Sequence, residues 1–377
     1  MLEGRKLLKT LIALLALICF LVTALVGSFY FAYSQEIDRI LAVGLIVKTQ
    51  YLHDVSMSQM LQGAAKGMVE SLQDPYSVYM NQKEFKNMQQ YIQGSIAGIG
   101  IYVGVKDNKL IVISPIEGTP AYKAGIQRDD EIIKINETLT GDIDEDQAVA
   151  LMRGDPGTQV TVTVLREGIP LEFTLIREVI DIPSVESKLL PDKIGYLRIK
   201  LFSSNSDEAL SQQLQGLQKD GMKALVLDLR DNPGGDLDSA VNIAKNFVSQ
   251  GPIVFIVNKS GDTEPYAVAE GNNVQIPLAV LINGGSASAS EVLSGAIKDT
   301  KTGVLIGEKS FGKGIVQGVF QLSNEEGLKL TTSKYLTPNK IDIHDKGIEP
   351  DIIIKPGQGN VDVQLQKSLE VLKEKIK

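Results

Sequence analysis

Between residues 183 and 356, apolar runs of strand length alternate with turns and helical patterns. Buried-looking strands are predicted over 224–229 and 276–282, and each is followed by a glycine-containing turn and a helix, over 237–248 and 288–298. Strands that regularly alternate with helices form an α/β layer structure. We therefore expect an α/β core here, completed by strands over 253–258, 304–307, 315–322 and 328–335.

Residues 93–180 show a different pattern, with short β-branched runs separated by Gly, Pro, Asn and Asp turns and one predicted helix. A small, mostly β module with one helix beside an edge strand suits β-strand addition. In that mode an extended peptide pairs with the edge while its carboxylate binds backbone amides. The amide loop could be Gly98, Ile99, Gly100 and Ile101, because glycine lets the backbone approach an anion closely.

The N-terminal part contains an uncharged, mostly apolar run over 11–33. At about 1.5 Å per residue, a helix of this length would cross a hydrocarbon core about 30 Å thick. Because Arg5, Lys6 and Lys9 precede the run, we expect residues 1–10 to be a cytoplasmic tail and the run to be a transmembrane anchor in contact with membrane lipid. The protein would then be a single-pass protein of the cell membrane with its catalytic domain extracytoplasmic. A cleaved signal peptide, which would give a secreted protein, is the alternative.

Two further segments have apolar residues at helical spacing. One covers 35–92 and is interpreted as an N-terminal helical cap or stalk, and the other is a C-terminal helix over 361–377. Neither contains a pattern that indicates chemistry. Their amphipathic faces could form a homodimer contact.

The composition excludes several kinds of site. The single cysteine, Cys19, allows no internal disulfide and no multi-thiolate metal site, and the two histidines, His53 and His344, form no H-E-x-x-H zinc helix. The net charge is −8 with no basic block, which disfavours nucleic-acid binding. We therefore expect no metal, no cofactor and no nucleic-acid partner.

Small residues gather over 284–291, where a predicted strand meets a predicted helix. They leave room for a substrate chain, and a serine at a helix N-terminus lies in positive potential that favours an oxyanion. Ser288 and Glu291 also match the S-x-x-E pattern of a capping box, which is a sufficient structural reason for that serine. The pattern alone leaves both interpretations open, and the G-x-S-x-G elbow of other hydrolases is absent.

A nucleophilic serine needs a base, and two are available downstream. His344 lies among charged residues in a turn-like segment, whereas Lys313 lies between two glycines before a strand that contains the polar Gln317. To act as a base, Lys313 must be neutral, so its pKa must fall from about 10.4 to about 7–8. Burial against apolar walls can supply the roughly 4 kcal/mol that this change requires. Because lysines in turns are usually solvated, the pattern alone does not identify the base.

Several motifs in order along the chain resemble those of the carboxyl-terminal processing (tail-specific) serine peptidase family, whose members carry a PDZ domain. The motifs are NGGSASASE at 283–291, SFGKG at 310–314, DLRDNPGG at 228–235, DPYS at 74–77, MRGDPGT at 152–158, IGYLRI at 194–199 and KGIEPD at 346–351. The runs that resemble a bacterial protease-associated PDZ domain are GIGI at 98–101, TPAYKAGI at 119–126 and DEII at 130–133. The resemblance extends over nearly all of the chain after the apolar run.

This resemblance implies a serine endopeptidase with an α/β core of the crotonase-like, tail-specific protease type. It places the nucleophile at Ser288, the base at Lys313 and a lysine-orienting glutamine at Gln317. It also implies that protein substrates dock their C-terminal tails in the PDZ domain over 93–180.

The resemblance further implies an oxyanion hole built from backbone N–H groups. One donor would be Ala289, directly after the nucleophile, and the other would be Gly234 or Gly235. The resemblance does not choose between the two glycines.

Two other functions are compatible with the sequence. A membrane-anchored PDZ adaptor would bind tails without cleaving them, and labelling by a serine-directed probe would distinguish the enzyme from it. A Ser–His hydrolase of small esters would use His344 as its base, so that replacing His344 rather than Lys313 would abolish its activity.

Overall fold

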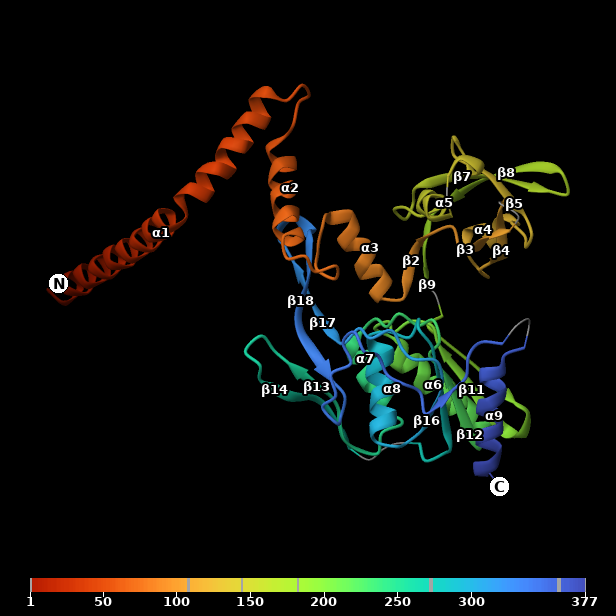
Figure 1. Ribbon diagram of the computed structural model, residues 1–377. Helices are drawn as coiled ribbons and strands as arrows, with labels where there is room; N and C mark the ends of the chain where they lie inside the picture. The colour runs from red at the N-terminus through yellow and green to blue at the C-terminus, as the bar shows by residue number, and fades with distance from the viewer. Residues whose placement is uncertain are drawn as a thin grey trace. The chain divides into compact units, whose positions relative to one another are not determined.

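The computed structural model describes residues 2–106, 109–143, 145–181, 183–270, 274–357 and 361–376. Within these ranges, the side chains at 2–11, 13, 26, 29, 30, 32, 106, 145 and 146 are not described. The predicted cytoplasmic tail, 1–10, therefore lies outside the described side chains. The chain forms two compact units, Met1–Asp74 and Pro75–Lys377 (Figure 1).

The first unit consists of two helices. α1 (Leu2–Gln50) departs from helical dihedral angles at Tyr33, where φ is −120° and ψ is 18°. α2 (Met57–Glu70) begins with a capping box: Ser56 Oγ accepts the Gln59 N–H at 3.1 Å, and Gln59 Oε1 accepts the Ser56 N–H at 3.0 Å. This reciprocal pair satisfies donors that the first turn of a helix leaves open.

The transmembrane anchor predicted over 11–33 is wrong. Within the described part of the chain, none of the helices combines the length and the apolar character that crossing a membrane requires. The apolar run is one part of the 49-residue helix α1, which continues into a segment with Glu36, Asp38 and Arg39. A count of uncharged residues does not show how far a helix extends beyond them. The anchor is therefore removed from the predicted fold class, and the location that depended on it stays a prediction.

The segment 35–92 is not helical throughout. It contains β1 (Val78–Met80), which pairs antiparallel with β18 (Gly327–Leu336). α3 (Gln82–Ile92) follows, with Asn81 as its N-cap. A strand of three residues is too short to produce a period-2 signal, so the helical pattern extends across it in the sequence.

A small β module with its own core follows α3. Its strands are β2 (Ser95–Gly98), β3 (Ile101–Lys106), β4 (Lys109–Pro115), β5 (Glu131–Ile135), β6 (Thr138–Leu139), β7 (Gln159–Arg166), β8 (Ile169–Ile176) and β9 (Glu178–Asp181), and its helices are α4 (Pro120–Ala124) and α5 (Glu145–Met152). The main sheet has the order β3-β4-β5-β7-β8, with β6 on β5, and β2 pairs separately with β9. Val112, Ile135 and Val162 are fully buried between these elements. A core of this kind is what an independent domain requires.

The second core belongs to a six-stranded sheet. Its order is β10 (Val185–Leu190), β11 (Ile194–Ile199), β12 (Ala224–Asp228), β15 (Leu278–Ile282), β16 (Val304–Gly307) and β19 (Ile352–Ile353). All neighbouring pairs are parallel except β10 with β11. The accompanying helices are α6 (Ser206–Lys219), α7 (Leu237–Ala244), α8 (Ala289–Asp299) and α9 (Val363–Ile376).

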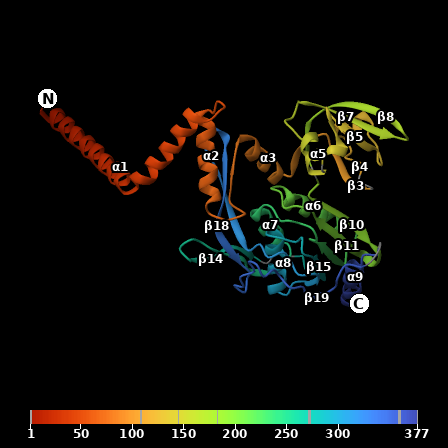
Figure 2. The same ribbon diagram turned by 45° about the horizontal axis from the view of Figure 1, so that its top comes forward.

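Helices cover both faces of this sheet. In β12, Leu225 and Leu227 belong to the apolar cluster formed with α6, α7 and α8, whereas Ala224 and Val226 belong to the cluster formed with α9. Figures 1 and 2 show α9, in blue, beside the strands of this sheet. Since alternate side chains of a strand point to opposite faces, a strand covered on both faces has a continuous apolar sequence. This explains why β12 and β15 were the clearest strands in the sequence.

The remaining strands form a separate sheet, in contrast to the single α/β sheet that the sequence predicted. They are β13 (Gln250–Val257), β14 (Thr263–Glu270) and β17 (Ile315–Gln321), together with β1 and β18. The order is β1-β18-β13-β14, with β17 also paired to β18, and every pairing is antiparallel. The local pattern predicted these strands, but the choice of partner depends on contacts between distant segments.

The loops after β12, β15 and β16 leave the sheet at the carboxyl ends of neighbouring parallel strands. Such ends meet at one edge of a sheet, which is where α/β proteins bind ligands. The loops contain the 228–235, 283–291 and 310–314 motifs, so the fold brings these motifs together.

Candidate active site

The loops after β12, β15 and β16 line a cavity of about 410 Å³. Ser288 lies at the start of α8, Lys313 in the loop after β16 and Gln317 on β17, and all three line the cavity. Gly234 and Gly235 contribute to the wall from the loop after β12. The predicted nucleophile, base, orienting amide and oxyanion turn therefore lie around one pocket.

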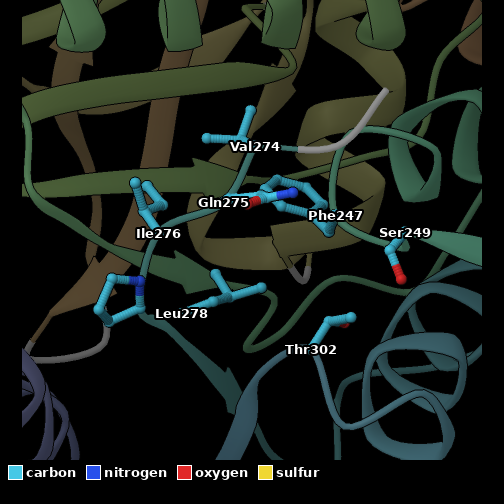
Figure 3. Close-up of a pocket in the computed structure, with 8 residues that line it drawn as sticks. Phe247, Ser249, Val274, Gln275, Ile276, Leu278 and Thr302 are labelled. Atoms are coloured by element: carbon cyan, nitrogen blue, oxygen red, sulfur yellow. The ribbon is translucent and has the colours of Figure 1, made fainter. Parts of the chain in front are cut away.

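A second cavity, of about 330 Å³, is a poorer candidate (Figure 3). It is lined by Phe247, Ser249, Thr302 and the segment 274–278. None of these residues has an ionisable side chain, so the cavity contains no base that could activate Ser249 or Thr302. Hydrolytic chemistry is therefore expected at the first cavity.

Burial distinguishes the three serines of the SASAS run. Ser286 and Ser290 are fully buried, and their hydroxyls donate to the carbonyl oxygens of Leu229 (2.8 Å) and Asn232 (2.9 Å). These two serines therefore attach the loop after β12 to the start of α8. Ser288 is partly exposed and is the one serine of the three that lines the cavity.

The backbone of Ser288 has an unusual conformation, with φ 54° and ψ −115°. A positive φ costs a residue with a side chain about 1–3 kcal/mol, and it persists where surrounding contacts hold it. Here the Ser288 N–H donates to Glu291 Oε2 at 2.9 Å, and the Ser288 carbonyl accepts the Glu291 N–H at 2.7 Å. A strained turn between a strand and a helix is also how other hydrolases expose their nucleophile.

Position 234 requires glycine because the segment at Ala287 and Ser288 passes too close to it for a side chain. A Cβ atom there would lie 2.7 Å from the carbonyl oxygen of Ala287 and 2.8 Å from Ser288 Cβ, and the φ of Gly234 is 103°. The loop after β12 thus lies directly against the nucleophile.

Backbone N–H groups beside Ser288 could bind an oxyanion. The Gly234 N–H is already used, since it donates to Asn232 Oδ1 at 2.9 Å. Within the described residues, no hydrogen bond occupies the N–H of Gly235 or of Ala289, and both residues line the cavity. Ala289 and Gly235 are therefore the better pair of donors.

Lys313 is partly buried and lies against an aromatic ring. Its Nζ is 4.9 Å from the centroid of Tyr76, which is within the range of a cation–π contact. Such a contact favours the charged form of an amine. Tyr76 belongs to the DPYS motif, for which the sequence indicated no role in chemistry.

One buried carboxylate connects the lysine loop to the serine. Glu291 is fully buried in α8, and its Oε1 accepts from Ser310 Oγ (2.5 Å) and the Gly312 N–H (2.7 Å). Its Oε2 accepts from the N–H groups of Ser288 (2.9 Å) and Lys313 (2.8 Å). A buried charge is stable when it is hydrogen-bonded in this way. Glu291 thereby links the backbones that carry the predicted nucleophile and base.

Gln317 offers a buried donor to the cavity. Its Nε2 is buried without a hydrogen-bond partner in the described part of the chain, and so is the hydroxyl of Thr331, the residue opposite on β18. An unpaired buried polar group costs about 1–3 kcal/mol. This arrangement suits a side chain that binds a substrate group or a neighbouring catalytic residue.

In the β module, the predicted carboxylate loop connects β2 to β3. Gly98 ends β2 and Ile101 begins β3. The two residues between them, Ile99 and Gly100, are buried. Gly100 has a φ of 81°, and a Cβ there would collide with the side chain of Thr119. A tight turn at the start of a strand is where a strand-addition module would bind a terminal carboxylate.

The chain is similar to known proteins over most of its length. Three family models match: Peptidase family S41 over residues 193–354, a PDZ domain over 111–166 and the activating protease CtpB N-terminal domain over 29–84. The carboxy-terminal processing protease CtpB of Bacillus subtilis is 38% identical over 327 residues, which cover 85% of this chain and 68% of that protein. The chain belongs to peptidase family S41.

Other S41 peptidases are similar over comparable lengths. The carboxyl-terminal-processing protease of Synechocystis sp. is 35% identical over 324 residues, which cover 82% of this chain and 76% of that protein. The solved structure of a photosystem II D1 C-terminal processing protease aligns with a TM-score of 0.54 at 30% identity, covering 86% of this chain and 89% of that one. This S41 peptidase is therefore a serine-type endopeptidase of the carboxyl-terminal processing group, with a PDZ domain.

The histidine that would make this S41 peptidase a Ser–His enzyme lies outside the pocket. His344 is not among the residues that line the cavity. Its backbone nitrogen instead lies against Gly314, where a Cβ would be 2.7 Å away. The structure therefore does not favour His344 as the base.

Two residues beside the candidate cavity have no site role assigned from the sequence. Glu291 was interpreted as part of a capping box, although its carboxylate also reaches the lysine loop. Tyr335 lines the cavity from β18 and received no role. Nothing in the local pattern marks either contact, because each joins segments that are far apart in the sequence.

Proposed function

We propose that this S41 peptidase cleaves peptide bonds with a Ser288–Lys313 dyad and selects its substrates by their C-terminal tails. One observation carries the proposal: Ser288 is the serine of the SASAS run that reaches the cavity, which it shares with Lys313. The N–H groups of Ala289 and Gly235, which have no hydrogen-bond partner among the described residues, lie on the same wall.

In the first half-reaction, neutral Lys313 Nζ accepts the proton of Ser288 Oγ while that oxygen attacks the carbonyl carbon of the scissile bond. The carbonyl oxygen becomes an oxyanion, which the N–H groups of Ala289 and Gly235 stabilise. The tetrahedral intermediate then breaks its C–N bond, and the Lys313 ammonium returns the proton to the departing amine. The product is an acyl ester on Ser288.

In the second half-reaction, water attacks the ester carbon and Lys313 accepts a proton from that water. Ester C–O cleavage then releases the new carboxyl terminus, and the proton returns to Ser288 Oγ. Gln317, whose buried Nε2 has no partner in the part of the chain that the structure describes, would orient the lysine or the substrate during these steps.

The proposed chemistry predicts that activity rises with pH, because Lys313 accepts a proton only when it is neutral. The Tyr76 ring opposes this by favouring the ammonium form. Lys313 must therefore lose its proton, against the attraction of the ring, before the serine can be activated.

Tail selection is assigned to the PDZ domain. In this domain β2 and β9 form a two-stranded sheet, and β3 lies at the edge of the main sheet. The Gly98–Ile101 turn leads into β3, and strand addition on β3 would bind a terminal carboxylate at this turn. If the tail is recognised in this way, a substrate with an amidated C-terminus should be cleaved with a higher KM than the same substrate with a free carboxylate. Removal of residues 95–178 would distinguish recruitment, where cleavage is lost, from gating, where inhibition is relieved.

The experiment that tests the dyad is cleavage of an apolar-tailed protein by the full chain and three variants. Ser288→Ala and Lys313→Ala should each abolish cleavage, while His344→Ala, the matched control, should retain it. Full activity of Ser288→Ala or Lys313→Ala would reject the proposal, and loss of activity in His344→Ala alone would indicate a Ser–His enzyme instead.

A further inference from the structure

The backbones of Ser288 and Lys313 are joined by two side chains in a symmetric way. Both N–H groups donate to the same atom, Glu291 Oε2, at 2.9 and 2.8 Å. Both carbonyl oxygens lie within hydrogen-bonding distance of the Tyr335 hydroxyl, at 3.0 Å for Ser288 and 2.8 Å for Lys313. Glu291 therefore holds the N–H groups of both residues, and the Tyr335 hydroxyl lies against the carbonyl oxygens of both.

Tyr335 is well placed to act as the second of these links. Its side chain is 2% exposed, and it enters the cavity wall from β18, which pairs with β17, the strand that follows the lysine loop. Its backbone N–H also donates to the Gly314 carbonyl at 3.1 Å, so Tyr335 binds two consecutive residues of the lysine loop. Burial, together with the Glu291 carboxylate, raises the pKa of the phenol well above its ordinary value, so the hydroxyl stays a donor over the working pH range.

The lysine loop needs such external contacts. Lys313 lies between Gly312 and Gly314, and glycine restricts the backbone less than any other residue. The amine is at the end of a flexible side chain, so its position relative to Ser288 Oγ depends on where the loop holds the Lys313 backbone. A displacement of about 1 Å in catalytic geometry can cost about a hundredfold in rate.

We propose that Tyr335 is a positioning residue, whose hydroxyl sets the position of the lysine loop relative to the serine and so controls the rate of serine activation. This inference rests on the proposed Ser–Lys dyad and adds to it a residue whose hydroxyl binds the backbone carbonyls of the dyad and takes no part in proton transfer. On the serine side, the Ser288 carbonyl also accepts N–H groups of Glu291 and Val292, at 2.7 and 3.0 Å. The effect of Tyr335 is therefore expected mainly on Lys313.

The test is Tyr335→Phe in the full chain, because phenylalanine keeps the ring in the cavity wall and removes the hydroxyl. We expect kcat to fall about tenfold, as for the loss of one hydrogen bond that matters in the transition state, with KM changed less than twofold. The second-order rate of labelling by a fluorophosphonate probe should fall by the same factor, since it also depends on activated Ser288. The rates are measured below the melting temperature, so that all molecules are folded.

The matched control is Tyr196→Phe. Tyr196 is a half-buried tyrosine of the protease core whose hydroxyl, like that of Tyr335, donates a hydrogen bond, in this case to Asp228 at 2.8 Å, and it does not line the cavity. Both variants should lose some thermal stability, but Tyr196→Phe should keep the wild-type kcat and labelling rate. A merely structural role of Tyr335 would give the same result for the two variants.

The Lys313→Ala variant separates a failure of this inference from a failure of the proposed function. If Lys313→Ala is inactive while Tyr335→Phe cleaves and labels at the wild-type rate, the dyad stands and the positioning role is overturned. If Lys313→Ala remains fully active, the dyad itself is rejected and the positioning role with it.

Discussion

Replacing Glu291 by glutamine tests how the nucleophile and the base are held together. Glutamine has the size of glutamate but only one side-chain oxygen, and its other terminal group is an NH2 donor. Glu291 accepts hydrogen bonds from four donors, two at each oxygen: Ser310 and Gly312 at one, Ser288 and Lys313 at the other. Whichever way the amide is oriented, two of these donors lose their acceptor and face another donor.

The expected loss of stability follows from those two donors. An unsatisfied buried donor costs about 1–3 kcal/mol, so the two donors together should lower the free energy of unfolding of Glu291→Gln by about 2–6 kcal/mol. Because a domain is typically stable by about 5–15 kcal/mol, the variant should still fold at 25 °C. Urea unfolding is followed by circular dichroism, because the chain contains no tryptophan. The kcat should also fall, since the lysine loop loses part of its connection to Ser288.

The control for this variant is Glu370→Gln. Glu370 is exposed on α9 and pairs with Lys367 at 2.9 Å, and exposed pairs of this kind contribute about 0–1 kcal/mol. If the free energies of unfolding of Glu291→Gln and the control differ by less than about 0.5 kcal/mol, the Glu291 carboxylate does not hold the lysine loop and the start of α8 together.

Three further outcomes are expected. Ser286→Ala should lower the melting temperature but remain labelled by a serine-directed probe at Ser288, because the Ser286 hydroxyl is buried and structural. Tyr76→Leu should move the acidic limb of the pH–activity profile to lower pH, since the ring that favours the lysine ammonium is gone. Burial alone would raise the pKa of Asp362, but its hydrogen bonds from Arg230 lower it below 3.8. Its contribution to stability is therefore present above that pH and lost as the pH falls through the lowered value, so Asp362→Asn should lower the melting temperature at pH 7 and much less at about pH 3.

The core sheet could be predicted from the sequence because its strands are covered on both faces. Residues 224–229 are apolar except for Asp228, and residues 276–282 are a continuous apolar run; β12 (Ala224–Asp228) and β15 (Leu278–Ile282) lie within them. The helix predicted over 288–298 corresponds to α8 (Ala289–Asp299). Such patterns are local, and burial imposes them directly on each segment.

The N-terminal anchor and the partition of the strands into two sheets could not be predicted in the same way. Both depend on what lies beyond the local window: the extent of α1, the pairing of β17 with β18, and the pairing of β18 with β13. Apolar composition and period-2 alternation are compatible with more than one partner. Local pattern therefore predicts elements better than it predicts their arrangement.

The site shows the same limit. Ser288 and Lys313 could be named because motifs mark them, but the contacts of Glu291 and Tyr335 join loops that are distant in the chain. The conformation of Ser288, with its positive φ, also has no local sequence signal. These features arise only when three loops meet at one edge of the sheet.

In the proposed mechanism an amine activates Ser288, so labelling of this serine should depend on Lys313. The full chain and Lys313→Ala are incubated with a fluorophosphonate probe, and the adduct is located by peptide mapping. The Ser288–Lys313 dyad predicts one adduct, on Ser288, which forms in the wild-type protein and not in Lys313→Ala. An adduct on another residue, or labelling of Lys313→Ala at the wild-type rate, would contradict it.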